Sequence, residues 1–113
     1  MAKVKLITLN VKDKPGSIAD AIQALAEAGV SVRSVFGWGP DGVVQLTVDD
    51  SRKATKALRA SGAEFSAAKA EVVELVDKPG TLHAYLAKLA KKGVNLRSIA
   101  SSDGKTLVWT STD

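Results

Sequence analysis

The sequence of 113 residues contains no cysteine, and this absence removes several kinds of chemistry. Disulfide bonds, thiolate nucleophiles and cysteine-bound zinc or iron–sulfur sites are all excluded. Aromatic residues are also scarce, at 4% of the chain. No apolar run approaches the roughly 18 residues of a membrane span, and the amino-terminal segment becomes polar too early for a signal peptide. We therefore expect a cytoplasmic protein with no membrane partner.

Signatures of catalysis are missing as well. The sequence has no recognisable nucleophile–base pair, no phosphate-binding loop of the Walker type and no cluster of metal ligands, so we expect no enzyme activity, catalytic residue, metal or cofactor. The single histidine, His83, lies beside an apolar stripe and is interpreted as a surface residue. The net charge of +4 fits an anionic partner, although a plain lysine-rich surface gives the same value.

An internal repeat is the main positive feature. The residues Asp-Lys-Pro-Gly at positions 13–16 occur again at 77–80, and residues 13–35 match residues 77–99 at ten of 23 positions with a constant offset of 64. Such a match predicts two units of similar structure. We place them at residues 1–70 and 71–113.

The first copy has the residue pattern of a strand–helix–strand–strand–helix–strand unit. Runs rich in Val, Leu, Ile and Thr indicate strands, and Gly, Pro and Asp-Gly indicate the turns between them. The predicted elements are, in chain order, a strand at 3–12, a helix at 15–29, strands at 30–35 and 43–48 about a turn at 36–42, a helix at 51–60 and a strand at 64–70. This order is the split βαβ arrangement of the ferredoxin-like fold.

The first helix carries two local signals. Ser17 and Asp20 have the spacing of a capping box, and Ile18, Ile22 and Leu25 form an apolar stripe at helical spacing. The second copy repeats the stripe with leucines at 82, 86 and 89. Both helices are therefore expected to bury one face.

The second copy is shorter than the first. It provides a strand at 71–76, a helix at 79–92 and hairpin strands at 94–100 and 106–112, and then the sequence stops without a second helix or last strand. We predict an α+β protein, in which a ferredoxin-like βαββαβ unit is fused to a partial βαββ unit, with an antiparallel sheet and helices on one face. The unpaired edge expected along residues 71–76 favours a homodimer.

With these features the sequence resembles a tandem ACT domain protein whose second copy is truncated. The resemblance rests on the Asp-Lys-Pro-Gly segments, on helices that close with Gly29 and Gly93, and on the strand patterns Val-Ser-Val-Arg and Val-Asn-Leu-Arg. It implies a regulatory protein that binds a free amino acid or a related small metabolite. The ligand would lie between paired domains, at the first strand–helix loop of one and the second strand of its neighbour.

Carried over to this sequence, the resemblance implies two sets of ligand-binding residues. The first set is Asn10, Asp13, Pro15, Gly16, Ser17, Ile18, Ser31, Val32 and Arg33, and the second is Asp77, Pro79, Gly80, Thr81, Leu82, Asn95, Leu96 and Arg97. Their chemistry suits the ligand class, because a glycine lets backbone approach closely and the first helical amides attract a carboxylate. A simpler interpretation also stands, in which each Pro-Gly only starts a helix and each arginine is solvated.

Two other functions remain as alternatives to the regulatory sensor. RNA-recognition domains share this order of strands and helices, and the chain is basic, but the predicted central strands lack the aromatic residues on which such domains stack bases. We therefore do not expect a nucleic-acid partner. The second alternative is a structural assembly module whose loops bind no ligand.

Overall fold

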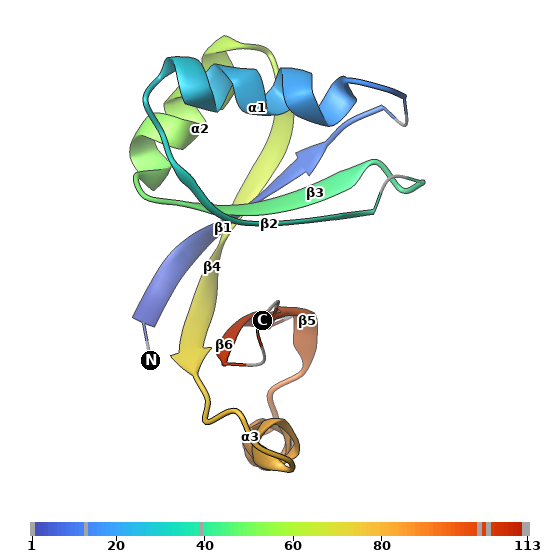
Figure 1. Ribbon diagram of the computed structural model, residues 1–113, viewed down its shortest axis with the longest axis vertical. Coiled ribbons are helices and arrows are strands. Elements are labelled where there is room, and N and C mark those ends of the chain that lie inside the picture. The colour runs from blue at the N-terminus through green and yellow to red at the C-terminus, as the bar shows by residue number, and fades with distance from the viewer. Residues whose placement is uncertain (1, 13, 39, 102, 104, 112–113) are drawn as a thin grey trace. The chain divides into compact units, whose positions relative to one another are not determined.

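The computed structural model describes residues 2–12, 14–38, 40–101, 103 and 105–111, and it confirms the α+β, ferredoxin-like fold class (Figure 1). The elements are β1 (Ala2–Asn10), α1 (Ser17–Glu27), β2 (Val32–Trp38), β3 (Val43–Val48), α2 (Ser51–Ala60), β4 (Glu64–Glu74), α3 (Thr81–Lys91), β5 (Leu96–Ala100) and β6 (Thr106–Ser111). Hydrogen bonding orders the strands β2-β3-β1-β4-β6-β5.

The chain divides into two compact units, residues 5–68 and residues 69–113 together with residues 1–4. The two strands predicted at 64–70 and 71–76 form one continuous strand, β4, which belongs partly to each unit. The predicted boundary between residues 70 and 71 therefore falls inside a strand.

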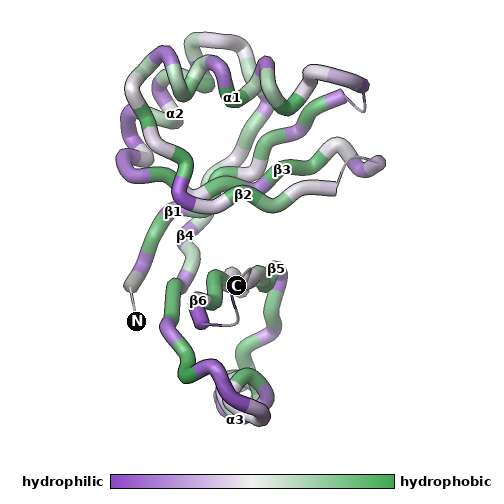
Figure 2. Tube along the Cα trace, in the orientation of Figure 1, coloured by the Kyte–Doolittle hydropathy of each residue, from purple (hydrophilic) through white to green (hydrophobic). Residues whose placement is uncertain are grey.

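The first unit has an apolar core between its strands and helices. Antiparallel pairing places Leu9 opposite Val44 and Ile7 opposite Leu46. Apolar segments alternate with polar ones along these strands (Figure 2), and alternate residues of a strand point to the same face. The buried cluster is completed by both helices and consists of Ile7, Leu9, Leu25, Val30, Val44, Leu46, Ala54 and Leu58. Val11, just after β1, packs against this cluster.

The second unit has a smaller core. Leu89 of α3 packs with Leu107 and Trp109 of β6, and the partly buried residues around them are Val73, Leu75, Tyr85, Leu86, Val94 and Leu96. The Trp109 indole Nε1–H donates a hydrogen bond to the Tyr85 hydroxyl at 2.8 Å. Trp109 is 8% exposed, so it is a packing residue of this unit.

The prediction of an unpaired strand edge along residues 71–76 is wrong. Residues 71–74 of β4 pair with β6, and β1 is the hydrogen-bonded neighbour of β4 on the other side. The start of β1 belongs to the same compact unit as residues 69–113. The first residues of β1 therefore form part of this second unit, while the rest of β1 belongs to the first.

Three local predictions also need correction. Ser17 and Asp20 form no capping box, because the N-cap of α1 is Gly16 and no side chain caps it. The predicted turn at 36–42 begins later, since β2 continues to Trp38, paired with Val43. Ile18 and Leu82 remain 43% and 47% exposed, so the first turn of each helix lies at the margin of its core.

Candidate functional site

The two Asp-Lys-Pro-Gly loops have nearly the same backbone geometry. Gly16 has φ 85° and ψ −10°, and Gly80 has φ 90° and ψ −15°, a left-handed conformation that glycine adopts at little cost. The Asp20 N–H donates to the Gly16 carbonyl at 2.9 Å, and the Ala84 N–H donates to the Gly80 carbonyl at 3.0 Å. The sequence repeat is thus also a repeat of local conformation.

Each loop leads into a helix whose amino end has no side-chain cap. Among the described residues, no side chain bonds to the first-turn amides of α1 or α3. The first N–H groups of a helix have no partners within the helix, and the helix dipole makes this end attractive to anions. A cap such as the one on α2, where the Asp50 carboxylate accepts from the Lys53 N–H at 3.1 Å, would compete with a ligand here.

A hollow of about 220 Å³ lies beside the first loop. Asn10 and Val11 contribute to it from the end of β1, Asp20 from the first turn of α1, and the chain between α2 and β4 forms the remaining wall up to Glu64. Asn10, Asp20 and Glu64 are all exposed. The hollow therefore offers two carboxylates and one amide next to the uncapped end of a helix.

Sequence reasoning found Asn10 but missed the two acids. The sequence predicts Asp20 only as the capping-box partner of Ser17, and Glu64 only as the start of a strand. Glu64 is 44 residues away from Asp20 in the chain, and no local pattern indicates that tertiary packing brings both to one hollow. Residues 69–113 have no described element that corresponds to α2, so the second loop lacks this wall.

The other predicted half of each site is a strand with an irregular register. Pairing of β2 with β3 shifts between Val32 and Ser34, and pairing of β5 with β6 shifts between Leu96 and Ser98. Arg33 and Arg97 are therefore the extra residues of two β-bulges, and both are exposed. Bulges re-aim side chains and are frequent next to functional sites. The sequence alone did not reveal this feature.

The loop and the bulge lie at opposite ends of the same unit. Asn10 pairs with Val43, which pairs with Trp38 at the end of β2, whereas the bulge is at the start of β2 beside Val48. At about 3.3 Å per residue, the seven residues of β2 separate them by roughly 20 Å. The second unit has the same arrangement, because Glu74 pairs with Thr106 and Leu96 pairs with Ser111. Neither unit brings its own two halves together.

The remaining predicted residues differ in their surroundings. Val32 and Leu96 pack against the two cores, and the Ser31 N–H donates to the Asp49 carboxylate at 3.0 Å. The exposed ones are Pro15, Asp77, Pro79 and Asn95, while Ser17 and Thr81 are the first helical residues; Asp13 lies outside the described residues. His83 is exposed, as expected.

Neither a metal-binding cluster nor a membrane-spanning helix is found among the described residues. No group of three or more His, Cys, Asp or Glu side chains is placed to hold a metal ion in that part of the chain. Within the same residues, no helix has the length and apolar character that crossing a membrane requires.

The sequence matches no protein-family model and no curated protein. Solved structures do match: a protein from Bacteroides thetaiotaomicron superposes with a TM-score of 0.86 at 18% identity, over 98% of this chain and 81% of that one. The ligand-free regulatory subunit of aspartate kinase from Thermus thermophilus superposes with a TM-score of 0.69 at 25% identity, over 96% and 82% of the two chains. The fold is ACT-like.

A third structural match is to part of a longer chain. E. coli aspartokinase III, solved in complex with lysine and aspartate, superposes with a TM-score of 0.62 at 19% identity, over 95% of this chain but only 27% of that one. A fold similar to that of this chain therefore occurs both in a regulatory subunit and in part of a longer aspartokinase chain.

Proposed function

We propose that this chain is a regulatory sensor, outside any membrane and in the cytoplasm, that binds a free amino acid or a related small metabolite and catalyses no reaction. The single observation that carries this proposal is the uncapped, glycine-led helix end beside a hollow lined by Asp20 and Glu64. Similarity in fold to aspartate kinase regulatory subunits supports the regulatory role.

The chemistry of the loop fits the two charged groups that every free amino acid carries. In the first turn of α1 the Ser17 and Asp20 N–H groups donate to the Lys14 and Gly16 carbonyls, at 3.3 and 2.9 Å. The α-carboxylate would be bound by the two N–H groups between them, those of residues 18 and 19, which lie at the positive end of the helix dipole. Asp20, Glu64 and the Asn10 amide would accept hydrogen bonds from the α-ammonium group. Opposite charges would thus be held on either side of the ligand's α-carbon.

We further propose that each site is completed by a second unit. The loop and the bulged strand of one unit lie at opposite ends, so an arginine at 33 or 97 can contact a loop-bound ligand only from another unit. This proposal includes the interpretation of the chain as a tandem pair of ACT-like units, the second one partial. A homodimer would provide the neighbouring units.

A screen of the twenty amino acids by thermal shift tests the proposal. A ligand that binds only the folded state raises its stability by about 2.7 kcal/mol at one hundred times the dissociation constant, so one member of the set should raise the melting temperature in a saturable way. A flat response to all twenty would refute amino-acid sensing and favour the structural assembly module.

Two glycine variants locate the site within that experiment. At Gly16 an added Cβ meets nothing within 4 Å of the protein, but it would occupy the open space in front of the helix amides. Gly16→Ala should weaken the binding found in the screen about tenfold or more.

Gly29→Ala is the matched control. Gly29 also has a positive φ, 75°, and equally open surroundings, so both variants carry a similar backbone strain of about 1 to 2 kcal/mol. It lies at the other end of α1 and should leave affinity unchanged. Gly80→Ala and Gly93→Ala form the same pair for the second loop. Equal affinities within both pairs would place the ligand elsewhere.

A further inference from the structure

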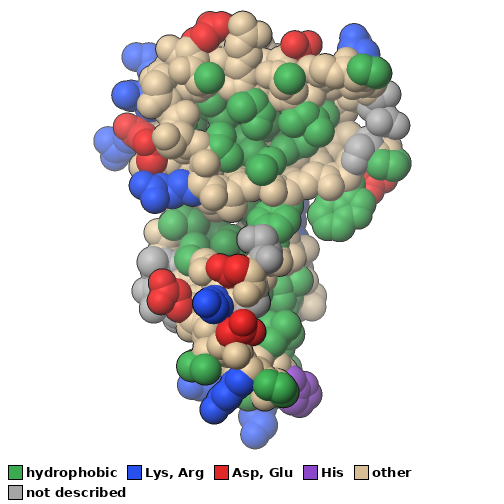
Figure 3. Space-filling model, in the orientation of Figure 1, with side chains coloured by type: hydrophobic (Ala, Val, Ile, Leu, Met, Phe, Trp, Pro, Cys, Tyr) green, Lys and Arg blue, Asp and Glu red, His purple; other side chains and the backbone are tan. Residues whose placement is uncertain are grey.

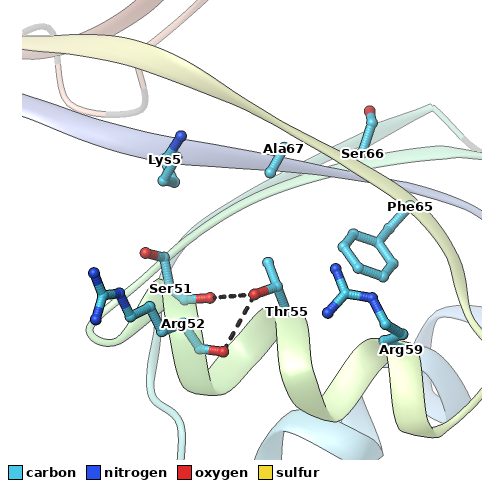
Figure 4. A pocket seen from close by; sticks show the side chains of 8 residues that line it. All are labelled: Lys5, Ser51, Arg52, Thr55, Arg59, Phe65, Ser66 and Ala67. Carbon is cyan, nitrogen blue, oxygen red and sulfur yellow. Dashed lines mark hydrogen bonds between the residues drawn. The ribbon is translucent and has the colours of Figure 1, made fainter.

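A second cavity, distinct from the loop hollow, lies within the unit of residues 5–68. It is open, has a volume of about 540 Å³, and lies beside α2 and the facing parts of β1 and β4 (Figure 4). The side chains with polar or aromatic groups that matter here are Lys5, Ser51, Arg52, Thr55, Arg59 and Phe65. None of them belongs to the proposed amino-acid site.

The lining of this cavity is strongly one-sided in charge. Lys5, Arg52 and Arg59 contribute three cations, and no carboxylate lines the cavity. Among the described residues, none of these three cations forms an ion pair. Lys and Arg side chains gather on the side of this unit where α2 lies (Figure 3). Cationic groups that are not neutralised within the protein attract an anionic ligand.

Arg59 is held in place by an aromatic ring. Its guanidinium carbon lies 5.9 Å from the centroid of the Phe65 ring, and Phe65 itself packs against the core of the unit. Figure 4 shows the guanidinium group next to the ring. A guanidinium attracted to a ring face in this way keeps its N–H donors available for a ligand.

The hydroxyl groups restrict the ligand further. The Thr55 hydroxyl donates to the Ser51 and Arg52 carbonyls at 3.0 and 3.2 Å, so it cannot also donate to a ligand. The donors left are two guanidinium groups, one ammonium group and the hydroxyls of Ser66 and of Ser51 at the first position of α2. A compact group with several negatively charged oxygen atoms matches such a set, and phosphate is the group that a guanidinium fork binds in bidentate fashion.

We propose that this cavity binds the phosphate group of a small phosphorylated molecule, one per chain. The described part of residues 69–113 contains no counterpart of α2, so the second unit cannot form the same cavity. A phosphate site here would give the chain a second input that is independent of the amino-acid loop.

Isothermal titration calorimetry of the full chain tests this proposal with three probes, namely pyrophosphate, ATP and citrate. At about physiological ionic strength, pyrophosphate and ATP should each bind with a stoichiometry of one. Equal affinities would identify phosphate as the whole ligand, and tighter binding of ATP would show that a nucleotide contributes more contacts. Citrate binding as tight as pyrophosphate binding would overturn the proposal, because charge alone would then explain it.

Charge-matched variants separate the cavity from the general basic surface. Arg59→Gln and Lys5→Gln should each weaken pyrophosphate binding about tenfold. Lys56→Gln removes the same charge from the same helix, but Lys56 is exposed and does not line the cavity, so it should change affinity less than about twofold. Arg59→Lys keeps the positive charge but removes the two-pronged guanidinium group. Its loss of pyrophosphate affinity should therefore lie between the losses in Lys56→Gln and Arg59→Gln.

Three results would contradict the site. Equal losses in Lys56→Gln and Arg59→Gln would indicate diffuse electrostatic attraction, and no binding by the wild-type chain would exclude the ligand class. Tight binding of single-stranded RNA with equal sensitivity to both variants would indicate a nucleic-acid surface instead. Circular dichroism shows whether Arg59→Gln folds. If it does not, the pyrophosphate affinity of Lys5→Gln alone tests the site, because Lys5 is exposed on β1 and its substitution should not disturb the core.

Discussion

Trp109 and Tyr85 show at the residue scale how the shorter unit closes its core. In the first unit Val35 pairs with Leu46, and α2 covers the core with Ala54 and Leu58. In the second unit Ile99 pairs with Trp109 in the corresponding position, and Tyr85 stands where the repeat has Ala21. Two large rings joined by a hydrogen bond, Tyr85 on α3 and Trp109 on β6, thus provide apolar cover where the described part of residues 69–113 has no counterpart of α2.

Tyr85→Phe tests this interpretation. The ring remains, but the Trp109 N–H loses its acceptor at a position where the indole is 8% exposed. A buried donor without a partner costs about 1 to 3 kcal/mol, so urea unfolding should show a loss of that size. Trp109→Phe and the double variant complete a mutant cycle. A coupling energy near zero between the two sites would show that the hydrogen bond adds nothing to stability.

Asp103 is the residue whose ionisation the structure changes most clearly. Its carboxylate accepts hydrogen bonds from the Thr106 and Lys105 N–H groups, each at 2.8 Å, in the hairpin between β5 and β6. These bonds, first that from Thr106, lower the pKa of Asp103 below its usual value. The charged form therefore stabilises the folded hairpin above the pKa of the unfolded chain, and this stabilisation is lost as the pH falls through the folded pKa.

A titration of the side-chain carboxyl carbons by NMR measures this effect. Asp103 should titrate with a midpoint below that of aspartate in an unstructured peptide, and Thr106→Pro should raise the midpoint because it removes the first donor. A midpoint at or above the peptide value would mean that the hairpin bonds do not form in solution.

At the element scale, predictions from sequence succeeded where the signal was local. The bounds of β3 and of α2 agree with the predicted ranges at both ends, because a polar cap such as Asp50 and a run of alternating apolar residues are each encoded by neighbours in the chain. The capping box at Ser17 failed because Gly16 takes the N-cap position in a left-handed conformation.

What the sequence could not predict depends on contacts between distant residues. The start of β1 belongs to the unit of residues 69–113 and β1 neighbours β4 in the sheet, so segments from distant parts of the sequence share one unit. The hollow beside the first loop likewise needs Glu64 next to Asp20, which only the packing of the α2–β4 connection achieves. The bulges at Arg33 and Arg97 depend on register with a partner strand. No periodicity in one segment specifies any of these arrangements.

At the scale of the whole molecule, the terminal strand of each unit carries exposed apolar side chains. β2 ends the strand order on one side and β5 on the other. Val35 on β2 is 52% exposed and Ile99 on β5 is 44% exposed, at positions that the sequence repeat relates to each other. Figure 3 shows apolar side chains on the face of the first unit between α1 and β2. Exposed apolar edge strands are where a second chain can pair.

The homodimer stays a prediction. Its physical basis is now the two terminal strands, β2 and β5, in place of the unpaired edge expected along residues 71–76. Val35→Lys and Ile99→Lys each put a charge on a terminal strand, and together they should convert a dimer into a monomer in sedimentation equilibrium at micromolar concentration. Val76→Lys is the control, because Val76 is 65% exposed but lies after β4 and outside any strand.

Since the loop and the bulge of one unit are roughly 20 Å apart, a forced monomer should also lose most of its amino-acid affinity if the completing unit comes from a second chain. A monomeric double variant with unchanged affinity would show that the chain forms its ligand site without a partner.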